Sequence, residues 1–182
     1  RSFDFTPQGL RITRRFAEAL PAAKALLVAV PENRDVLYLC ALAQRQLGDT
    51  PAALATLAGL ERVHPRFSRL HQELGYCKVT LRDGPGAIAS FLNAVNLNPA
   101  LPGSWAMLER LYTMIGNAAD ARAAAAHTAI LAKLPPEVVT ATSMYYDDDL
   151  EPAERLVRAF LLKHGNQVEA MRLLGRIALK RD

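Results

Sequence analysis

A single spacing of about 34 residues recurs along this chain and limits how the chain can fold. Ala53, Ala87 and Ala121 follow one another at this interval, and Leu57 and Phe91 repeat at the same spacing. The turn segments "LGDTP" and "LRDGP" recur in the same register. A fixed period of this length, with small residues at set positions, indicates a stacked array of helical hairpins.

The recurring residues have the chemistry expected at the ends and contacts of paired helices. Glycine with Asp or Asn favours a chain reversal and caps the helix that follows. Proline is tolerated in a first helical turn, and a later proline ends the second helix. The turns are Gly48-Asp49, Asp83-Gly84 and Gly116-Asn117, the helix-start prolines are Pro51 and Pro85, and the helix-end prolines are Pro65 and Pro99. We expect the two helices of a unit to approach closely at Ala41 and Gly75. The expected buried residues are Leu57, Leu74, Phe91 and Trp105.

The composition agrees with a helical protein. Hydrophobic residues make up 51% of the 182 residues, with alanine and leucine prominent, and this bias favours helices over strands. The net charge of +4 is too small to indicate nucleic-acid binding, and no apolar run is long enough to span a membrane. We expect Cys40 and Cys77 to be buried, reduced thiols. We also expect the protein to be cytoplasmic. Because the chain starts with Arg1, we interpret it as a segment of a longer protein.

The set of repeated positions resembles the tetratricopeptide repeat (TPR) family. The family motif has a large residue followed by Leu-Gly, Tyr, Ala, Phe, Ala and Pro in order. Its residues in the second unit are Leu74, Gly75, Ala87, Phe91, Ala94 and Pro99, and those in the third are Trp105, Leu108, Tyr112 and Ala121, with Glu109 in place of the small residue. The resemblance implies an all-α fold, a right-handed α-solenoid of antiparallel helix pairs.

We expect one TPR-like domain over residues 1–182. Its parts are a partial unit (1–33), three clear units (34–67, 68–101 and 102–135), a degenerate unit (136–167) and a half unit (168–182).

Several segments look like the N-terminal repeat region of bacterial TPR-containing sulfotransferases. They include "RLHQELGYCKVTLRDGPGAIASFLNAVNLNPALPGSW" and the stretch from "KLPPEVVT" onward. The resemblance implies that this segment is not itself an enzyme. It would be the scaffold or substrate-orienting part of a sulfotransferase whose catalytic domain lies beyond Asp182. The phosphosulfate donor would bind in that domain, so we expect no cofactor here.

No motif in the chain indicates catalysis, a cofactor or a metal. There is no glycine-rich phosphate loop, no nucleophile elbow and no paired histidine motif, and the four histidines are isolated. The run from Asp147 to Asp149, followed by Glu151, lacks the spacing and the central glycine of a calcium loop. We interpret it as a turn that places negative charge at the start of the next helix.

The resemblance assigns ligand binding to the concave wall formed by the first helix of each unit. The residues it places there are Tyr38, Leu42, Arg45, Arg69, Gln72, Tyr76, Arg110, Thr113, Arg172 and Arg176, and Tyr145 and Tyr146 fall near the same face. Arginine and tyrosine are typical of interface anchors. With Lys180, Asp35 and Glu169 on the same face, six cationic side chains stand against two acids, which favours a protein or extended peptide partner that is acidic.

Three alternatives stay open at this point. The arginine-rich stripe can be an ordinary solvated helix face. The chain can be a stand-alone TPR adaptor or dimerisation scaffold unrelated to sulfation. RNA binding by a related hairpin repeat is a third alternative, although such readers use a slightly longer unit and lack this packing set.

The last segment predicts self-association. Val168, Met171, Leu174 and Ala178 recur at helical spacing, and Ala170, Leu173 and Ile177 form a second apolar flank. One flank can pack on the preceding helix, and the other stays uncovered. We therefore expect the chain to pair with itself through residues 167–180.

Overall fold

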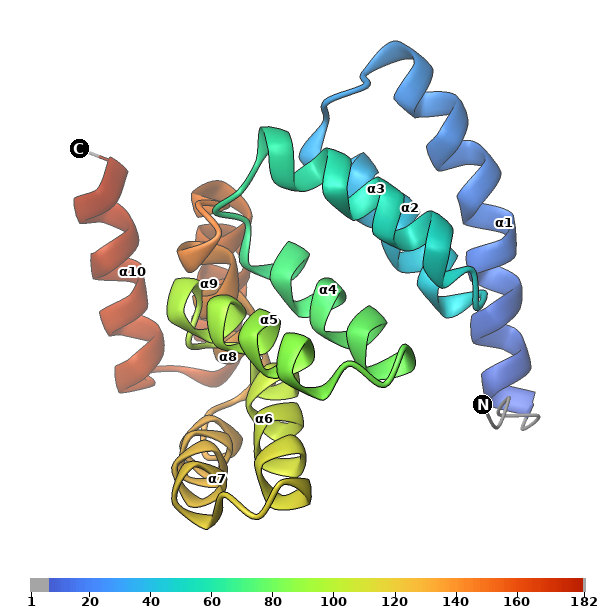
Figure 1. Ribbon diagram of the computed structural model, residues 1–182. Helices are drawn as coiled ribbons and strands as arrows, with labels where there is room; N and C mark the ends of the chain where they lie inside the picture. Colours follow the sequence, from blue (N-terminus) through green and yellow to red (C-terminus); the bar gives the residue numbers. More distant parts are fainter. Residues whose placement is uncertain (1–6, 182) are drawn as a thin grey trace. The chain divides into compact units, whose positions relative to one another are not determined.

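The computed structural model describes residues 7–181, and these residues form ten α-helices and no strand (Figure 1). The all-α fold expected from the repeat is confirmed. The helices are α1 (Pro7–Ala29), α2 (Arg34–Gln46), α3 (Thr50–Val63), α4 (Ser68–Thr80), α5 (Gly84–Leu97), α6 (Pro102–Met114), α7 (Ala118–Ala132), α8 (Pro136–Tyr146), α9 (Leu150–His164) and α10 (Val168–Arg181).

The chain divides into two compact units between Ser90 and Phe91, a boundary inside α5. In the first unit, α2 packs on α1, α3 and α4. In the second unit, α6 pairs with α7 and α8 pairs with α9, while α10 packs on both α8 and α9.

One residue in each hairpin turn adopts a left-handed backbone conformation. These residues are Gly48 (φ 90°), Arg82 (φ 61°), Gly116 (φ 75°) and Asp148 (φ 68°). Of the expected turn pair Asp83-Gly84, Asp83 supplies a capping side chain and Gly84 begins α5, while Arg82 takes the left-handed position that corresponds to Gly48. The residue that follows caps the next helix in three of the turns, where Asp49, Asp83 and Asn117 accept backbone N–H groups.

The spacing of these turns explains why the fourth hairpin looks degenerate. The first three left-handed residues are evenly spaced by one repeat period, whereas Asp148 follows Gly116 two positions early. Helix α8 begins at Pro136, one full period after α6 begins at Pro102, so the missing positions lie within α8, which has 11 residues where α6 has 13. Once this shift is applied, the fourth hairpin has packing residues of the same kind as the first, two alanines and a branched side chain.

The shared packing residues occupy equivalent places in the two cores. In the first unit, Ala41, Ala53 and Leu57 are fully buried in a cluster with residues of α4. In the second unit, Ala141, Ala153 and Val157 keep the same mutual spacing and are buried in a cluster with residues of α10, which are Ala170, Leu173 and Ile177. Two small residues permit close helix contact, and a branched side chain fills the space beside them.

The other expected core residues have mixed outcomes. Phe91 is fully buried, and Cys40 and Cys77 are buried free thiols, as expected. Leu74 and Trp105 are only partly buried. The Trp105 indole stacks on His127 with ring centroids 4.0 Å apart, and its Nε1 donates to the Pro99 carbonyl at 2.9 Å. Trp105 therefore joins α6 to α7 near the surface.

The second helix of the third hairpin, α7, buries very little. Ala121 and Ala124 are its buried residues, whereas Ile130 is exposed. Its sequence is mostly alanine, so apart from the stacking of His127 on Trp105 few large side chains of α7 are available to pack on α6.

A buried polar cluster holds the loop after α5 against α8. The Asn98 side-chain nitrogen donates to the Ser143 carbonyl at 3.0 Å, to the Ser143 hydroxyl at 2.9 Å and to the Asp147 carboxylate at 3.3 Å. Its oxygen accepts the Ala100 N–H at 3.0 Å. The three aspartates of the acidic run therefore have different structural roles. Asp147 is buried in this cluster, Asp148 adopts the left-handed turn conformation, and Asp149 precedes α9 without a side-chain cap bond.

Replacing Arg82 by glycine tests the turn assignment. A non-glycine residue in the left-handed region costs about 1–2 kcal/mol, and glycine removes that cost at the expense of a more flexible unfolded chain. We expect Arg82→Gly to raise the free energy of unfolding by about 0.5–1 kcal/mol in urea titrations. Gly48→Ala, at the equivalent turn, should lower it. A stability loss in Arg82→Gly would contradict the assignment.

Candidate binding surface

The predicted groove residues lie on first helices, and two pairs of these helices pack side by side within a unit. Helix α2 packs on α4 in the first unit, and α8 packs on α10 in the second. Of the predicted residues, Tyr38, Leu42 and Arg45 lie on α2, Arg69, Gln72 and Tyr76 on α4, Arg110 and Thr113 on α6, and Arg172 and Arg176 on α10.

The first cluster is centred on Arg45. Its guanidinium lies over the Tyr76 ring, with its carbon 4.8 Å from the ring centroid, and its Nε donates to the Glu73 carboxylate. The Glu73 side chain is only 4% exposed and that of Arg45 is 17% exposed. This cluster is therefore largely desolvated, and α2 is fixed to α4 by a charge pair and a cation–π contact.

A second aromatic contact lies at the start of the same two helices. The Tyr38 ring meets the Phe67 ring edge-to-face at 5.5 Å, and the Arg34 guanidinium lies 4.8 Å from the Phe67 centroid. Tyr38 also packs against the first core cluster. Part of Tyr38 is thus structural, and only its partly exposed remainder is available to a partner.

In the second unit, Arg176 of α10 meets two tyrosines of α8. Its guanidinium carbon lies 4.5 Å from the Tyr145 centroid and 5.5 Å from the Tyr146 centroid, and it donates to the Tyr146 hydroxyl at 3.4 Å. Lys180 lies 4.8 Å from the Tyr145 centroid and pairs with Asp148 at 2.9 Å. The adjacent tyrosines, themselves edge-to-face at 5.6 Å, therefore share one cationic partner.

The two arginine–tyrosine contacts occupy equivalent positions with the residues exchanged. The separation in sequence from Arg45 to Tyr76 is the same as that from Tyr145 to Arg176. In each unit the contact joins the last turn of one first helix to the middle of the next. The repeat supplies the geometry, and either order of the two residues satisfies it.

The remaining predicted residues are less organised. Arg110 and Thr113 are exposed on α6, and the Thr113 hydroxyl donates to the Glu109 carbonyl at 2.7 Å. Arg172 is exposed and pairs with Glu169 at 2.9 Å. Leu42, Arg69 and Gln72 are partly buried. The positive charge left for a partner is therefore smaller than the sequence count suggested, since Arg45, Arg172 and Lys180 already have acidic partners.

Burial changes the acidity of the first cluster. Burial raises the pKa of the Glu73 carboxyl above its ordinary value, and the hydrogen bond and charge of Arg45 offset part of that rise. Burial, followed by the charge of Glu73, raises the pKa of the Tyr76 phenol. Tyr76 is consequently a neutral hydrogen-bonding group at physiological pH.

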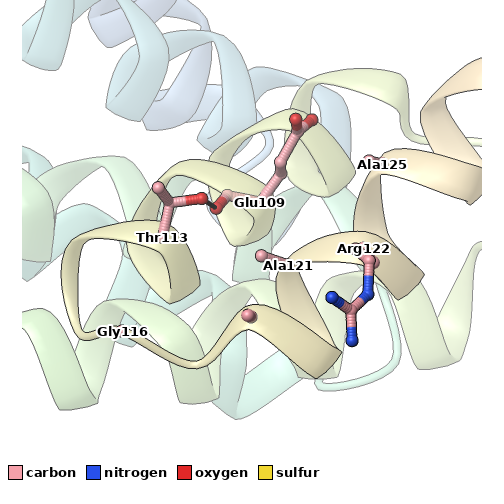
Figure 2. Close-up of a pocket in the computed structure, with 7 residues that line it drawn as sticks. Glu109, Thr113, Gly116, Ala121, Arg122 and Ala125 are labelled. Atoms are coloured by element: carbon pink, nitrogen blue, oxygen red, sulfur yellow. Dashed lines mark hydrogen bonds between the residues drawn. The ribbon is translucent and has the colours of Figure 1, made fainter.

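A cleft between α6 and α7 was not expected from the sequence. It has a volume of about 310 Å³ and is lined by Glu109, Thr113, Gly116, Ala118, Ala121, Arg122 and Ala125. Figure 2 shows these residues rising from α6, the turn and α7 around an open space. A side chain added at Gly116 would meet nothing within 4 Å.

Helix α10 packs with one flank and leaves the other open. Ala170, Leu173 and Ile177 are buried, while Val168, Met171 and Leu179 are 55%, 43% and 80% exposed. Leu174 belongs with the packed side, since it contacts the second core cluster. A side chain added at Gly175 would meet nothing within 4 Å, although Ala41 and Ala141 at the equivalent positions are fully buried.

The histidines have structural contacts. His64 and His71 bond through Nε2 to the carbonyls of Glu32 and Pro65, at 2.9 and 2.8 Å. His164 stacks on Phe160 at 4.6 Å. Within residues 7–181, no three His, Cys, Asp or Glu side chains are grouped so that they could hold a metal ion.

None of the helices in the described part of the chain is long and apolar enough to cross a membrane.

No protein-family model and no curated protein matches the chain by sequence. Solved structures match it in fold. The crystal structure of MamA aligns with a TM-score of 0.58 at 19% identity, covering 94% of this chain and 91% of MamA. TTC0263, a thermophilic TPR protein of Thermus thermophilus, aligns with a TM-score of 0.59 at 20% identity, covering 93% and 94%. The TPR-like fold is thereby confirmed.

Replacing Arg45 by alanine tests the buried charge pair. The change leaves the Glu73 carboxylate buried without a counter-charge, which should lower the free energy of unfolding by about 3 kcal/mol near neutral pH. Loss of Arg45 also raises the pKa of Glu73 further, so the folded protein binds a proton that the unfolded chain releases.

The loss in free energy of unfolding caused by Arg45→Ala should therefore shrink as the pH falls through the raised pKa of Glu73 toward the ordinary carboxyl value of 4.5. Urea unfolding at about pH 7 and about pH 4.5 measures this change. Arg155→Ala, which breaks an exposed pair with Glu151, is the matched control and should cost less than about 0.5 kcal/mol at either pH. A pH-independent deficit in Arg45→Ala would contradict the interpretation.

Proposed function

We propose that this chain is a non-catalytic protein-binding module that holds an extended polypeptide segment along its first helices. The observation that carries the proposal is the repeated arginine–tyrosine contact, Arg45 with Tyr76 and Tyr145 with Arg176. Each contact holds a planar cation and a phenol in fixed, partly exposed positions. Such groups offer large contact area and directed hydrogen bonds with little conformational entropy to lose.

The partner segment that suits this surface is acidic. Arg110 and Arg176 are exposed residues on first helices, and arginine binds carboxylates with two parallel hydrogen bonds. The internal ion pairs of Arg45 and Arg172 reduce the charge available, so the preference depends on a few arginines rather than on a broad basic field.

For the longer protein, we propose the sulfotransferase context implied by the sequence resemblance. In that context the chain would present an acceptor to a separate catalytic domain. A glycine-rich phosphate-binding loop in the sequence that follows residue 182 would support this context. A stand-alone adaptor is the alternative.

Helix α10 supports a second role, self-association through residues 167–180. Its exposed flank presents the positions that face a second helix elsewhere in the fold, as Leu37 and Ala41 of α2 do against α3. Met171 and Gly175 correspond to these two residues. The surface therefore suits an apolar helix, and a second copy of the chain can supply one.

Charge reversal on the first helices tests the binding proposal. In selections from a random peptide display library, wild type should enrich sequences rich in Asp and Glu. Arg69→Glu combined with Arg110→Glu should lose this enrichment while the chain stays helical by circular dichroism. The matched control combines Arg62→Glu with Arg155→Glu, two exposed arginines on second helices, and should keep the enrichment. Equal enrichment by all three proteins would leave only the solvated-stripe interpretation.

Sedimentation velocity tests the self-association. We expect a concentration-dependent dimer, and Met171→Glu should weaken it by placing a charge in an apolar contact. Lengthening the chain by about one helix should weaken it too, since that helix would cover the flank. Arg158→Glu on α9 is a control for charge alone. A strict monomer at high concentration would contradict the prediction.

A further inference from the structure

The cleft between α6 and α7 lies at the repeat position that other hairpins fill with a large side chain. Leu57 of α3 and Phe91 of α5, one repeat period apart, are both fully buried. The next residue in this series, one period further along, is Ala125, and Ala125 lines the cleft. Val157 of α9 is the equivalent buried residue in the fourth hairpin.

The other walls of the cleft belong to the same packing site. In the first hairpin, Leu57 shares a buried cluster with Ala41 and Ala53. Their equivalents in the third hairpin are Glu109 and Ala121, and both line the cleft. The lining residues all come from α6, α7 and the turn between them, so the hairpin itself leaves the space open.

The space is large enough for one side chain of leucine or phenylalanine size. Its volume is about 310 Å³, and an apolar cavity of roughly 150 Å³ already accepts benzene. Three alanines form its apolar wall. An apolar group placed there would gain the contacts that Leu57 and Val157 make in their own hairpins.

Two opposite charges stand at the rim. Glu109 is partly buried on α6 and Arg122 is exposed on α7, and neither side chain has an ion-pair partner within the described residues. Figure 2 shows the Glu109 carboxylate and the Arg122 guanidinium directed away from each other on either side of Ala121. An entering segment with one basic and one acidic residue beside its apolar side chain would match this arrangement.

We propose that the α6–α7 cleft binds a partner polypeptide by accepting one large apolar side chain from it in place of the missing filler. A basic residue of the partner pairs with Glu109, and an acidic residue on the other side pairs with Arg122. The site shares Thr113 with the predicted first-helix residues but includes none of the residues of the two arginine–tyrosine contacts.

The test titrates the chain with capped tripeptides and follows the NMR signals of Ala121 and Thr113. The probes are Lys-Phe-Glu and Glu-Phe-Lys, with Lys-Ala-Glu and Glu-Ala-Lys as matched controls. We expect the chemical shifts to saturate as a phenylalanine peptide is added. The matching alanine peptide should bind about tenfold more weakly or worse, because it cannot bury the phenyl ring. Glu109→Gln should lower the affinity for the phenylalanine peptide by about threefold and reduce the salt dependence of that binding.

Ala125→Phe restores the residue that the repeat carries at Phe91 and should fill the cleft. We expect it to abolish peptide binding while the melting temperature rises or stays unchanged. Ala123→Phe, on the opposite face of α7, is the matched control and should bind normally. The proposal is overturned if Ala125→Phe binds the peptide as wild type does, if it melts below Ala123→Phe, or if phenylalanine and alanine peptides bind equally. Arg69→Glu alone, on α4, should leave this binding intact, which separates the site from the first-helix surface.

Discussion

The close contact of two helices at paired alanines is the constraint on which the rest of this fold depends. Where Ala41 meets Ala53, and Ala141 meets Ala153, the helix backbones can approach so that one branched residue fills the space beside them. Each such contact fixes the hairpin and the position of the next first helix, because Leu57 and Val157 also pack on α4 and α10. The arginine–tyrosine contacts follow from this, since they join first helices that this packing has already brought side by side.

The sequence predicted the features that recur with the repeat, and it missed features that depend on individual residues. The period and its small residues were sufficient for the helix pairs and for the burial of Leu57 and Phe91. The left-handed turn conformation fell on Arg82, because register rather than residue type selects the position. The contacts of Arg176 with Tyr145 and Tyr146 were hidden because α8 is two residues shorter than the other first helices of the repeat units. Aligning the hairpin turns, rather than counting from the first unit, would have revealed that pairing.

The candidate binding surface shows a similar division. All the predicted residues lie on first helices, as the resemblance implied, but Glu73 was absent from the prediction. A count of side chains along one face cannot include it, since Glu73 is buried beneath Arg45 and acts through a contact between residues 28 positions apart. The α6–α7 cleft was missed for a different reason. It arises because Ala125 is smaller than the residues at the equivalent position of the other hairpins. Since α7 is rich in alanine, only a comparison of Ala125 with Leu57, Phe91 and Val157 indicates the cleft.

The sparse packing of α7 has a consequence for the dynamics of the chain. Local opening costs least where few apolar side chains are buried, and α7 buries two alanines where α3 and α9 bury larger residues as well. The backbone amides of α7 should therefore exchange with solvent through small fluctuations that leave the α8–α10 cluster closed. A hairpin that opens in this way can widen its cleft without unfolding its neighbours, so access to this part of the protein is governed by local stability rather than by a hinge.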